Sequence, residues 1–311
     1  MEPTPATGVA DFSLLMQRIT LLVPFPPGGS TTHTAEVLAD ALRHDFGIVV
    51  TFDYQTGDYG LNAMRSLVRA PDETVLMVGN IITASMTPVM QRERLEFDFI
   101  RDVVPISKLA DFPSILMTSL SAPVDDVAGL LQLCERRDRV LRYGSDFLGT
   151  FVDVDAIEVA RRAGLTAALH EAGSANGVLA ALMAGNIDMA LLNVATAVAN
   201  KGKYKPLAVS GPLRLAGFPG LPTMAEAGFD GVGVVQWQGL FASRRLRPDS
   251  VKALHAAIAR AMRSQTARAA LEAIDAEAVT SVSPAAFALQ IQAEMARWES
   301  MKAQILALPR V

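Results

Sequence analysis

The chain has 311 residues, enough for two domains of ordinary size, each with its own core. Half of the residues are hydrophobic and 19% are charged, which excludes intrinsic disorder and a long coiled coil. The net charge is −4 and Lys and Arg are spread along the chain without a long basic run, so no basic stripe forms and we expect no nucleic-acid partner.

The first 15 residues, MEPTPATGVADFSLL, lack the basic region and the long apolar region of a secretory signal. Two interpretations stay open. A signal has been removed and replaced by a starting Met, or the protein remains in the cytoplasm.

The first third of the chain alternates strands with helices. We expect strands at 19–23, 48–54 and 75–79, and helices from about residue 31 and over 59–69. The first helix carries Ala35, Leu38 and Leu42 on one face, and Gly47 stands where a helix-ending glycine belongs. This alternation is typical of βα units around a mostly parallel sheet.

A second block repeats the pattern. We expect strands at 114–118, 141–143, 167–170, 187–192 and 206–209, with helices over 127–137 and after Thr150. The only cysteine, Cys134, falls on the apolar face of the helix over 127–137, so we expect a buried thiol and no disulfide. The apolar stretch 178–199 is broken by Gly185 and Asn186, which favours a helix, a turn and a strand over a membrane span.

The C-terminal part is predicted to be helical. Leu254, Ile258 and Met262 share one helix face, and Ser283 with Pro284 has the N-cap and N1 pattern of a last helix. No flexible Gly/Ser-rich linker separates the blocks, so we expect ordered crossovers between two domains.

Two loops concentrate glycines and hydroxyls between a strand and a helix. They are Val23-Pro-Phe-Pro-Pro-Gly-Gly-Ser-Thr-Thr32 and Leu141-Arg-Tyr-Gly-Ser-Asp-Phe-Leu-Gly-Thr150. The first N–H groups of a helix lack intrahelical partners and lie at its positive end, so such loops suit an anion. One loop in each block favours a ligand cleft with a domain on each side.

Patterns for known catalysts and cofactors are missing. The first loop has no GK[ST], and GxGxxG, GxSxG, HExxH and CxxC do not occur, so we expect no cofactor and no metal. The most enzyme-like pair is His170-Glu171 at the end of a predicted strand. We favour a ligand-contacting or solvated pair over an acid–base dyad.

At these residues the sequence resembles the substrate-binding proteins of tripartite tricarboxylate transporters, the TctC or Bug family. The likeness runs from about Ile19 to the last helix. It rests on the first loop, on Tyr143-Gly-Ser145 with Gly149-Thr150, and on LAALMAGNID at 179–188. The most specific part is Pro219-Gly-Leu-Pro222-Thr223-Met-Ala-Glu226-Ala-Gly228 followed by Trp237-Gln-Gly239.

The resemblance implies an α/β fold with two Rossmann-like lobes joined by crossover segments, similar to type II periplasmic-binding proteins. Lobe one would be 18–112 plus 235–311, and lobe two 113–234. A carboxylate would be held between the lobes. Carried over by motif, the ligand-binding residues would be Phe25, Gly28, Gly29, Ser30, Thr31, Thr32, Ser145, Gly149, Thr150, His170, Glu171 and Ala172.

Some positions depart from the family pattern. Thr32 stands where the family usually has Asp, Glu36 where it often has Arg, and His170-Glu171-Ala172-Gly173 replaces a V-P-Y-K-G-like run. A neutral Thr32 beside the ligand predicts a preference for ligands that lack an amino group.

We therefore expect a solute-binding protein and not an enzyme. It would capture a small organic mono- or dicarboxylate and deliver it to a tripartite tricarboxylate-type transporter. The resemblance implies a periplasmic monomer whose partners are membrane transporter subunits if the protein is secreted. Two alternatives stay open: a cytoplasmic carboxylate sensor or carrier of the same fold, and an enzyme using His170 and Glu171.

Overall fold

The computed structural model describes residues 17–71, 73–274 and 276–311. The N-terminal segment that lacks signal features lies outside the described residues. The chain folds into two compact units, each with its own sheet. Unit 1 contains the residues up to Asp111 and Trp237–Glu299, and unit 2 contains Phe112–Gln236 and Ser300–Val311.

The sheet of unit 1 has the strand order β11-β4-β10-β3-β1-β2. β1 is parallel to both β2 and β3, whereas β10 is antiparallel to β3, so the sheet is mixed. The strands are β1 (Arg18–Val23), β2 (Val49–Tyr54), β3 (Val75–Asn80), β4 (Val103–Phe112), β10 (Gln236–Ser243) and β11 (Glu277–Ala278).

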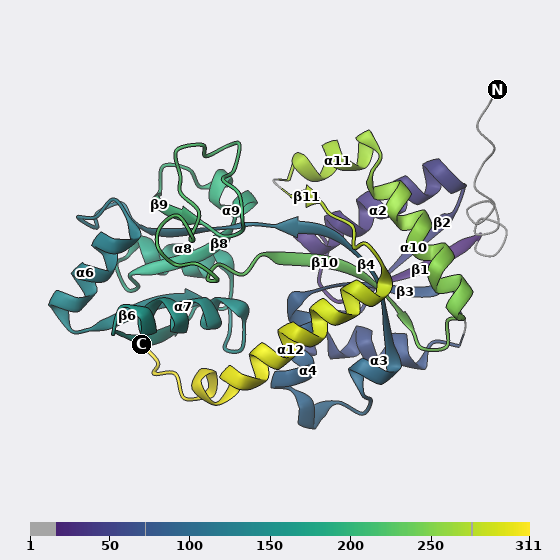
Figure 1. The fold of residues 1–311 in the computed structure, drawn as a ribbon, viewed down its shortest axis with the longest axis horizontal. Coiled ribbons are helices and arrows are strands. Elements are labelled where there is room, and N and C mark those ends of the chain that lie inside the picture. Colours follow the sequence, from purple (N-terminus) through teal and green to yellow (C-terminus); the bar gives the residue numbers. More distant parts are fainter. Residues whose placement is uncertain (1–16, 72, 275) are drawn as a thin grey trace. The chain divides into compact units, whose positions relative to one another are not determined.

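Helices cover both faces of this sheet. In the view of Figure 1, α2 and α11 lie above the strands and α3 and α4 below them. As expected, Leu38 and Leu42 of α2 are buried, and Gly47 ends this helix at a left-handed φ of 67°. The helices are α2 (Ser30–Phe46), α3 (Leu61–Arg69), α4 (Thr87–Met90), α5 (Phe99–Asp102), α10 (Pro248–Met262), α11 (Gln265–Glu272) and α12 (Pro284–Leu306).

The last helix packs on an aromatic cluster of unit 1. The rings of Trp237 and Phe287 meet edge to face at 5.1 Å between centroids. Gly239 lies under this cluster, where a Cβ would come within 2.5 Å of the Phe287 ring. The predicted N-cap is confirmed, because the Ala286 N–H donates to Ser283 Oγ at 3.1 Å.

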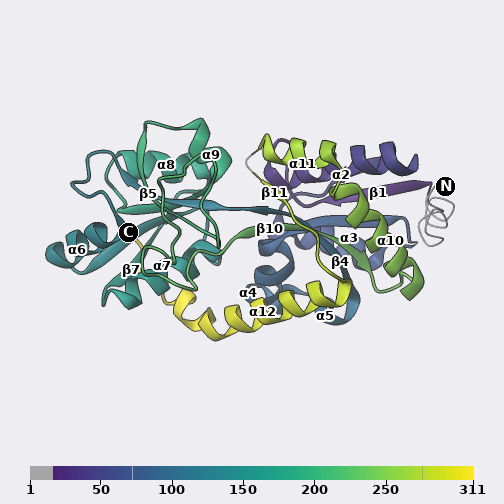
Figure 2. The same ribbon diagram turned by 45° about the horizontal axis from the view of Figure 1, so that its top comes forward.

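The sheet of unit 2 has the order β7-β6-β8-β5-β9, with β6 parallel to β7 and β8 and with β5 antiparallel to β8 and β9. Figure 2 shows α7 on one side of these strands and α8 and α9 on the other. The strands are β5 (Ser114–Ser119), β6 (Val140–Ser145), β7 (Thr166–Glu171), β8 (Met189–Asn193) and β9 (Tyr204–Val209), and the helices α6 (Val127–Arg137), α7 (Phe151–Arg162), α8 (Ala175–Met183) and α9 (Val194–Ala199).

Two sequence predictions for unit 2 are confirmed. The helix over 127–137 begins and ends as expected, and Cys134 is fully buried, which raises the pKa of its thiol to about 12. The apolar stretch 178–199 divides into the end of α8, β8 and α9. Among the described residues, no helix is long and apolar enough to cross a membrane.

The last residues of the chain belong to unit 2, whereas the sequence placed 235–311 in lobe one. The physical reason is a backbone pairing to the edge strand β7. The Leu169 N–H donates to Pro309 O at 2.8 Å, and the Val311 N–H donates to Leu169 O at 3.0 Å. The hydrophobic periodicity of α12 gives no sign of this pairing, because the residues that pair with β7 follow the end of the helix.

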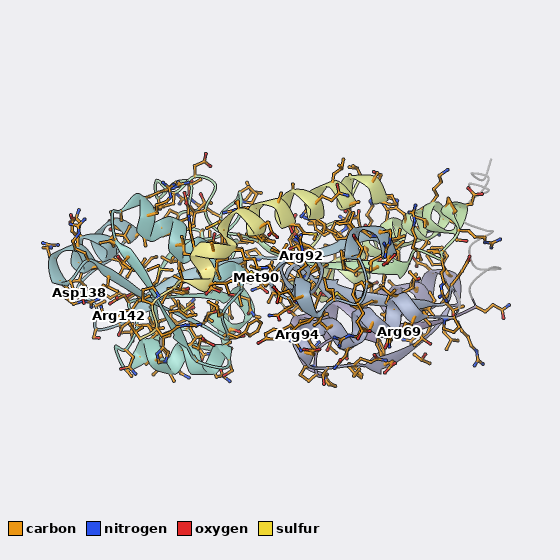
Figure 3. All side chains as sticks on the ribbon, turned by 90° about the horizontal axis from the view of Figure 1, so that it is seen from below. Arg69, Met90, Arg92, Arg94, Asp138 and Arg142 are labelled. Carbon is orange, nitrogen blue, oxygen red and sulfur yellow. The ribbon has the colours of Figure 1, made fainter. Side chains whose placement is uncertain are left out.

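Charged side chains of unit 2 gather at the start of β6. Arg142 of this strand is ion-paired with Asp138, and the two labels lie side by side in Figure 3. Arg137 forms a bidentate ion pair with Asp188: its Nη1 donates to Oδ1 at 2.9 Å and its Nη2 donates to Oδ2 at 2.8 Å. These ion pairs lie at the amino end of the strand, and the candidate loop follows its carboxyl end.

Candidate functional site

The first candidate loop follows β1 in unit 1. Phe25 is half-buried, and the segment 26–29 after it is exposed. Gly28 has a φ of 93°, which side chains rarely adopt, and a Cβ there would meet nothing within 4 Å. Gly28 is therefore required by the backbone conformation of the turn. The loop residues just before α2 have their backbone exposed to solvent.

The N-terminus of α2 has no cap from a side chain. Gly29 is the N-cap residue, and the first turn contains no acidic residue. The first helical bond runs from the His33 N–H to Gly29 O, so the N–H groups of Ser30, Thr31 and Thr32 precede the helical ladder. These groups and the helix dipole form an end that can take an anion.

The hydroxyls of this turn have unequal roles. Thr32 is fully buried and donates to Pro26 O at 3.2 Å, so its side chain stabilises the loop. Glu36 is exposed and lies 3.2 Å from His33 Nδ1. The preference for ligands that lack an amino group stays a prediction, and the Thr32 hydroxyl proton is used within the loop.

Sequence reasoning missed one polar residue that contacts this loop, Gln238 of β10. Its side chain is fully buried, and its Oε1 accepts a hydrogen bond from Thr31 Oγ1 at 2.9 Å. Its Nε2 donates to Ser30 Oγ at 3.3 Å, which leaves the Ser30 hydroxyl proton free to donate elsewhere. Gln238 thus orients both hydroxyls.

Replacing Gln238 with Leu should weaken binding of a carboxylate about tenfold, because Ser30 loses the donor that fixes its orientation, a change of roughly 1.4 kcal/mol. Calorimetric titration measures the effect. The exposed Gln132 of α6 offers the matched control, Gln132→Leu, which should bind as the parent does. Equal affinity of Gln238→Leu and the parent would remove Gln238 from the site.

The second candidate loop follows β6 in unit 2. Ser145 Oγ lies 2.9 Å from Thr150 Oγ1 and 3.0 Å from Phe147 O, so these hydroxyls bond within the loop. Gly149 has a φ of 92° and precedes the N-cap Thr150 of α7. The loop has the expected strand-to-helix geometry.

The N–H groups of this loop already have an acceptor. Asp153 Oδ2 accepts from Gly149 N at 2.6 Å and from Thr150 N at 2.8 Å, and its Oδ1 accepts from Tyr143 OH at 2.7 Å. The expectation of unpaired N–H groups is therefore wrong for Gly149 and Thr150. Asp153 is fully buried, and desolvation raises its carboxyl pKa to about 6.

The segment 170–172 lies beside this loop. Glu171 pairs with Ser145 in the parallel register of β6 and β7, and the Ala172 N–H donates to Ser145 O at 2.9 Å. Its polar side chains contact the end of the chain: His170 Nδ1 lies 3.1 Å from Val311 O, and Glu171 is ion-paired with Arg310. This arrangement holds the last residues on β7 and gives no sign of an acid–base dyad.

The candidate residues thus form one group in each unit. Phe25 and the segment 28–32 lie together in unit 1, and Ser145, Gly149 and Thr150 lie with 170–172 in unit 2. In the part of the chain that the structure describes, no group of His, Cys, Asp or Glu side chains has an arrangement that could hold a metal ion.

Comparison with known proteins identifies the family. Residues 34–306 match the model of the tripartite tricarboxylate transporter family receptor. Protein BugT of Bordetella pertussis is 25% identical over 267 residues, covering 85% of this chain and 81% of the relative.

Solved structures agree in fold. The chain is similar to Rpa4515 of R. palustris with adipate, at 27% identity and a TM-score of 0.78, covering 94% of this chain and 99% of that chain. It is also similar to MatC of Rhodopseudomonas palustris with bound malate, at 25% identity and a TM-score of 0.74, covering 92% and 99%. The α/β fold of two sheet-containing units and the match over most of the chain place this protein in the tripartite tricarboxylate transporter receptor family of solute-binding proteins, which are not enzymes.

Proposed function

We propose that this protein captures a small organic carboxylate and that the loop of unit 1 supplies the main contact to the carboxylate group. The observation that carries this proposal is the N-terminus of α2, where no side chain caps the helix and the N–H groups of 30–32 precede the helical ladder, beside exposed glycines and the oriented Ser30 hydroxyl. The adipate and malate in the similar solved structures are both carboxylates.

The family supports delivery of the ligand to a tripartite tricarboxylate-type transporter. Its members are described as receptors of such transporters. The proposed setting is the periplasm, and the proposed partners are the membrane subunits of the transporter. The receptor would act as a monomer.

Gly29 offers a sharp test of the carboxylate contact. Its φ of −91° suits any residue, and a Cβ there would meet nothing within 4 Å. In Gly29→Asp, the N-cap carboxylate would accept hydrogen bonds from the N–H groups of the first turn. It would thereby occupy the position proposed for the carboxylate of the ligand. We expect carboxylate binding to fall at least a hundredfold while the free energy of unfolding rises by up to about 1 kcal/mol.

The matched control is Gly29→Ala, which fills the same space without a charge. Calorimetric titration with small carboxylates should give it an affinity within a few fold of the parent. If Gly29→Asp binds carboxylates as tightly as Gly29→Ala does, the N-terminus of α2 is not the carboxylate site and the proposal fails.

A further inference from the structure

Asn80 is the last residue of β3, at the carboxylate site of unit 1. In the sheet, β3 lies between β1 and β10. The loop to α2 follows β1 and Gln238 belongs to β10, so the hydrogen bonds of Gln238 with Ser30 and Thr31 cross over β3. Asn80 is the residue of β3 that lies opposite Gln238 in the antiparallel register. The first turn of α2 therefore lies over Asn80.

The Asn80 side chain lies on the face of the sheet that α2 covers. Directly opposed residues of antiparallel strands have their side chains on one face, about 5 Å apart at Cβ, and Gln238 contacts α2 on that face. Packing around Gly60 agrees with this placement. A Cβ on Gly60 would lie 2.5 Å from Thr83 Cγ2 and 3.5 Å from Pro24 Cβ, so the turn after β3 is beside the first loop.

One end of the Asn80 amide is in use and the other is not. Its Oδ1 accepts from the Thr83 N–H at 3.0 Å, and this N–H can only donate, so the amide oxygen faces Thr83 and Nδ2 does not. Asn80 is 7% exposed, yet among the described residues no acceptor bonds its Nδ2. Because this nitrogen is not fully buried, a ligand atom can reach it.

The hydrogen-bonding groups left at this point are mainly donors. The N–H groups of 30–32 precede the helical ladder, and the Ser30 hydroxyl proton is free to donate. The amide oxygens of Gln238 and Asn80 already accept hydrogen bonds. A carboxylate only accepts, so it satisfies such a set of donors, whereas an amide brings N–H groups of its own.

We infer that Asn80 is a specificity-determining residue of the carboxylate site, and that its Nδ2 donates to the carboxylate bound at the N-terminus of α2. The inference rests on the proposed function, because it adds a donor from the sheet to those of the loop and the helix. All of these groups belong to unit 1. The π-helical turn Ile82–Met86, which follows Asn80, is a conformation often found at functional sites.

Asn80→Asp tests this contact with little change in shape. One oxygen of the new side chain can still accept from the Thr83 N–H, so the melting temperature of the free protein should stay near that of the parent. The other oxygen replaces the donor with an acceptor and a negative charge. In calorimetric titrations near neutral pH with adipate, malate and hexanoate, the parent should bind at least one acid, and the variant should bind it at least about thirtyfold more weakly.

The amides of the same acids separate a ligand contact from a purely structural role. The parent should bind the amide of the preferred acid at least about tenfold more weakly than the acid itself. In Asn80→Asp this preference should shrink, because the new carboxylate accepts the N–H groups of the amide. The control is Asn186→Asp, the same change at an exposed residue of the turn before β8, which should keep the affinities of the parent.

Two further measurements decide the matter even if Asn80→Asp folds poorly. Asn80→Ser keeps an oxygen for the turn and removes the donor, so it should bind the acid about tenfold more weakly than the parent. In the parent, the side-chain amide signals of Asn80 in a proton–nitrogen correlation spectrum should shift on adding the acid, and those of Asn186 should not. Parent-like affinity of Asn80→Ser, with unshifted Asn80 signals, overturns the inference and leaves the proposed function standing. If the parent binds none of the three acids, both fail.

Discussion

Replacing Trp298 with Ala should lower the free energy of unfolding by about 3–5 kcal/mol, the range for truncating a buried Trp. Trp298 of α12 is 1% exposed, and its Nε1 donates to Ser85 Oγ at 2.9 Å. Ser85 lies in the π-helical turn Ile82–Met86 after β3. The truncation leaves a cavity beneath α12 and removes a hydrogen bond that joins this helix to the turn.

Chemical denaturation followed by circular dichroism measures this loss. The control is Trp298→Phe, which keeps most of the ring volume and removes the N–H donor, so it should cost only about 1–2 kcal/mol. A loss below about 1 kcal/mol in Trp298→Ala would mean that α12 contributes little to the core of unit 1, contrary to the packing described.

The second large effect is a pH dependence due to Asp153. Burial raises the folded-state pKa of this carboxyl from the ordinary 3.8 to about 6, so the folded protein holds the proton more tightly than the unfolded chain. The stabilisation is complete below about pH 4 and is lost as the pH rises through about 6. A shift of this size corresponds to about 3 kcal/mol.

Unfolding free energies of the parent and of Asp153→Asn, measured from about pH 4 to about pH 7, isolate this effect. Burial also raises the carboxyl pKa of Asp111, Asp146 and Glu294, and these contributions are shared by both proteins and cancel in the difference. The stability of the parent relative to the variant should fall with rising pH. A difference that is flat over this range would place the Asp153 pKa near its ordinary value.

The sequence predicted the elements well where one local signal decided the structure. The helix over 127–137 combined an apolar face with the N-cap Asp126, whose Oδ1 accepts from Gly129 N at 2.6 Å. Gly47 and Ser283 likewise marked helix ends through local geometry. Long-range pairing was not visible in this way, as the residues after α12 show by joining β7.

In the candidate site, too, the sequence revealed the features with a local signal and missed those that depend on long-range contacts. Both loops were evident from their glycines and hydroxyls, but Gln238 is 207 residues from its partner Thr31 in the chain, and no periodicity links them. Asp153 had a local signal, since Thr150 and Asp153 have the spacing of a capping box. That spacing was a sign that the second loop already contained its own anion.

The central claim, capture of a small carboxylate, is tested most directly by a thermal-shift panel on the full chain. A carboxylate present at about 100 times its dissociation constant stabilises the folded state by about 2.7 kcal/mol and raises the melting temperature. We expect such a rise with small carboxylates and none with sugars or cationic amino acids. Stabilisation by sugars or cations, with no response to any carboxylate, would contradict it.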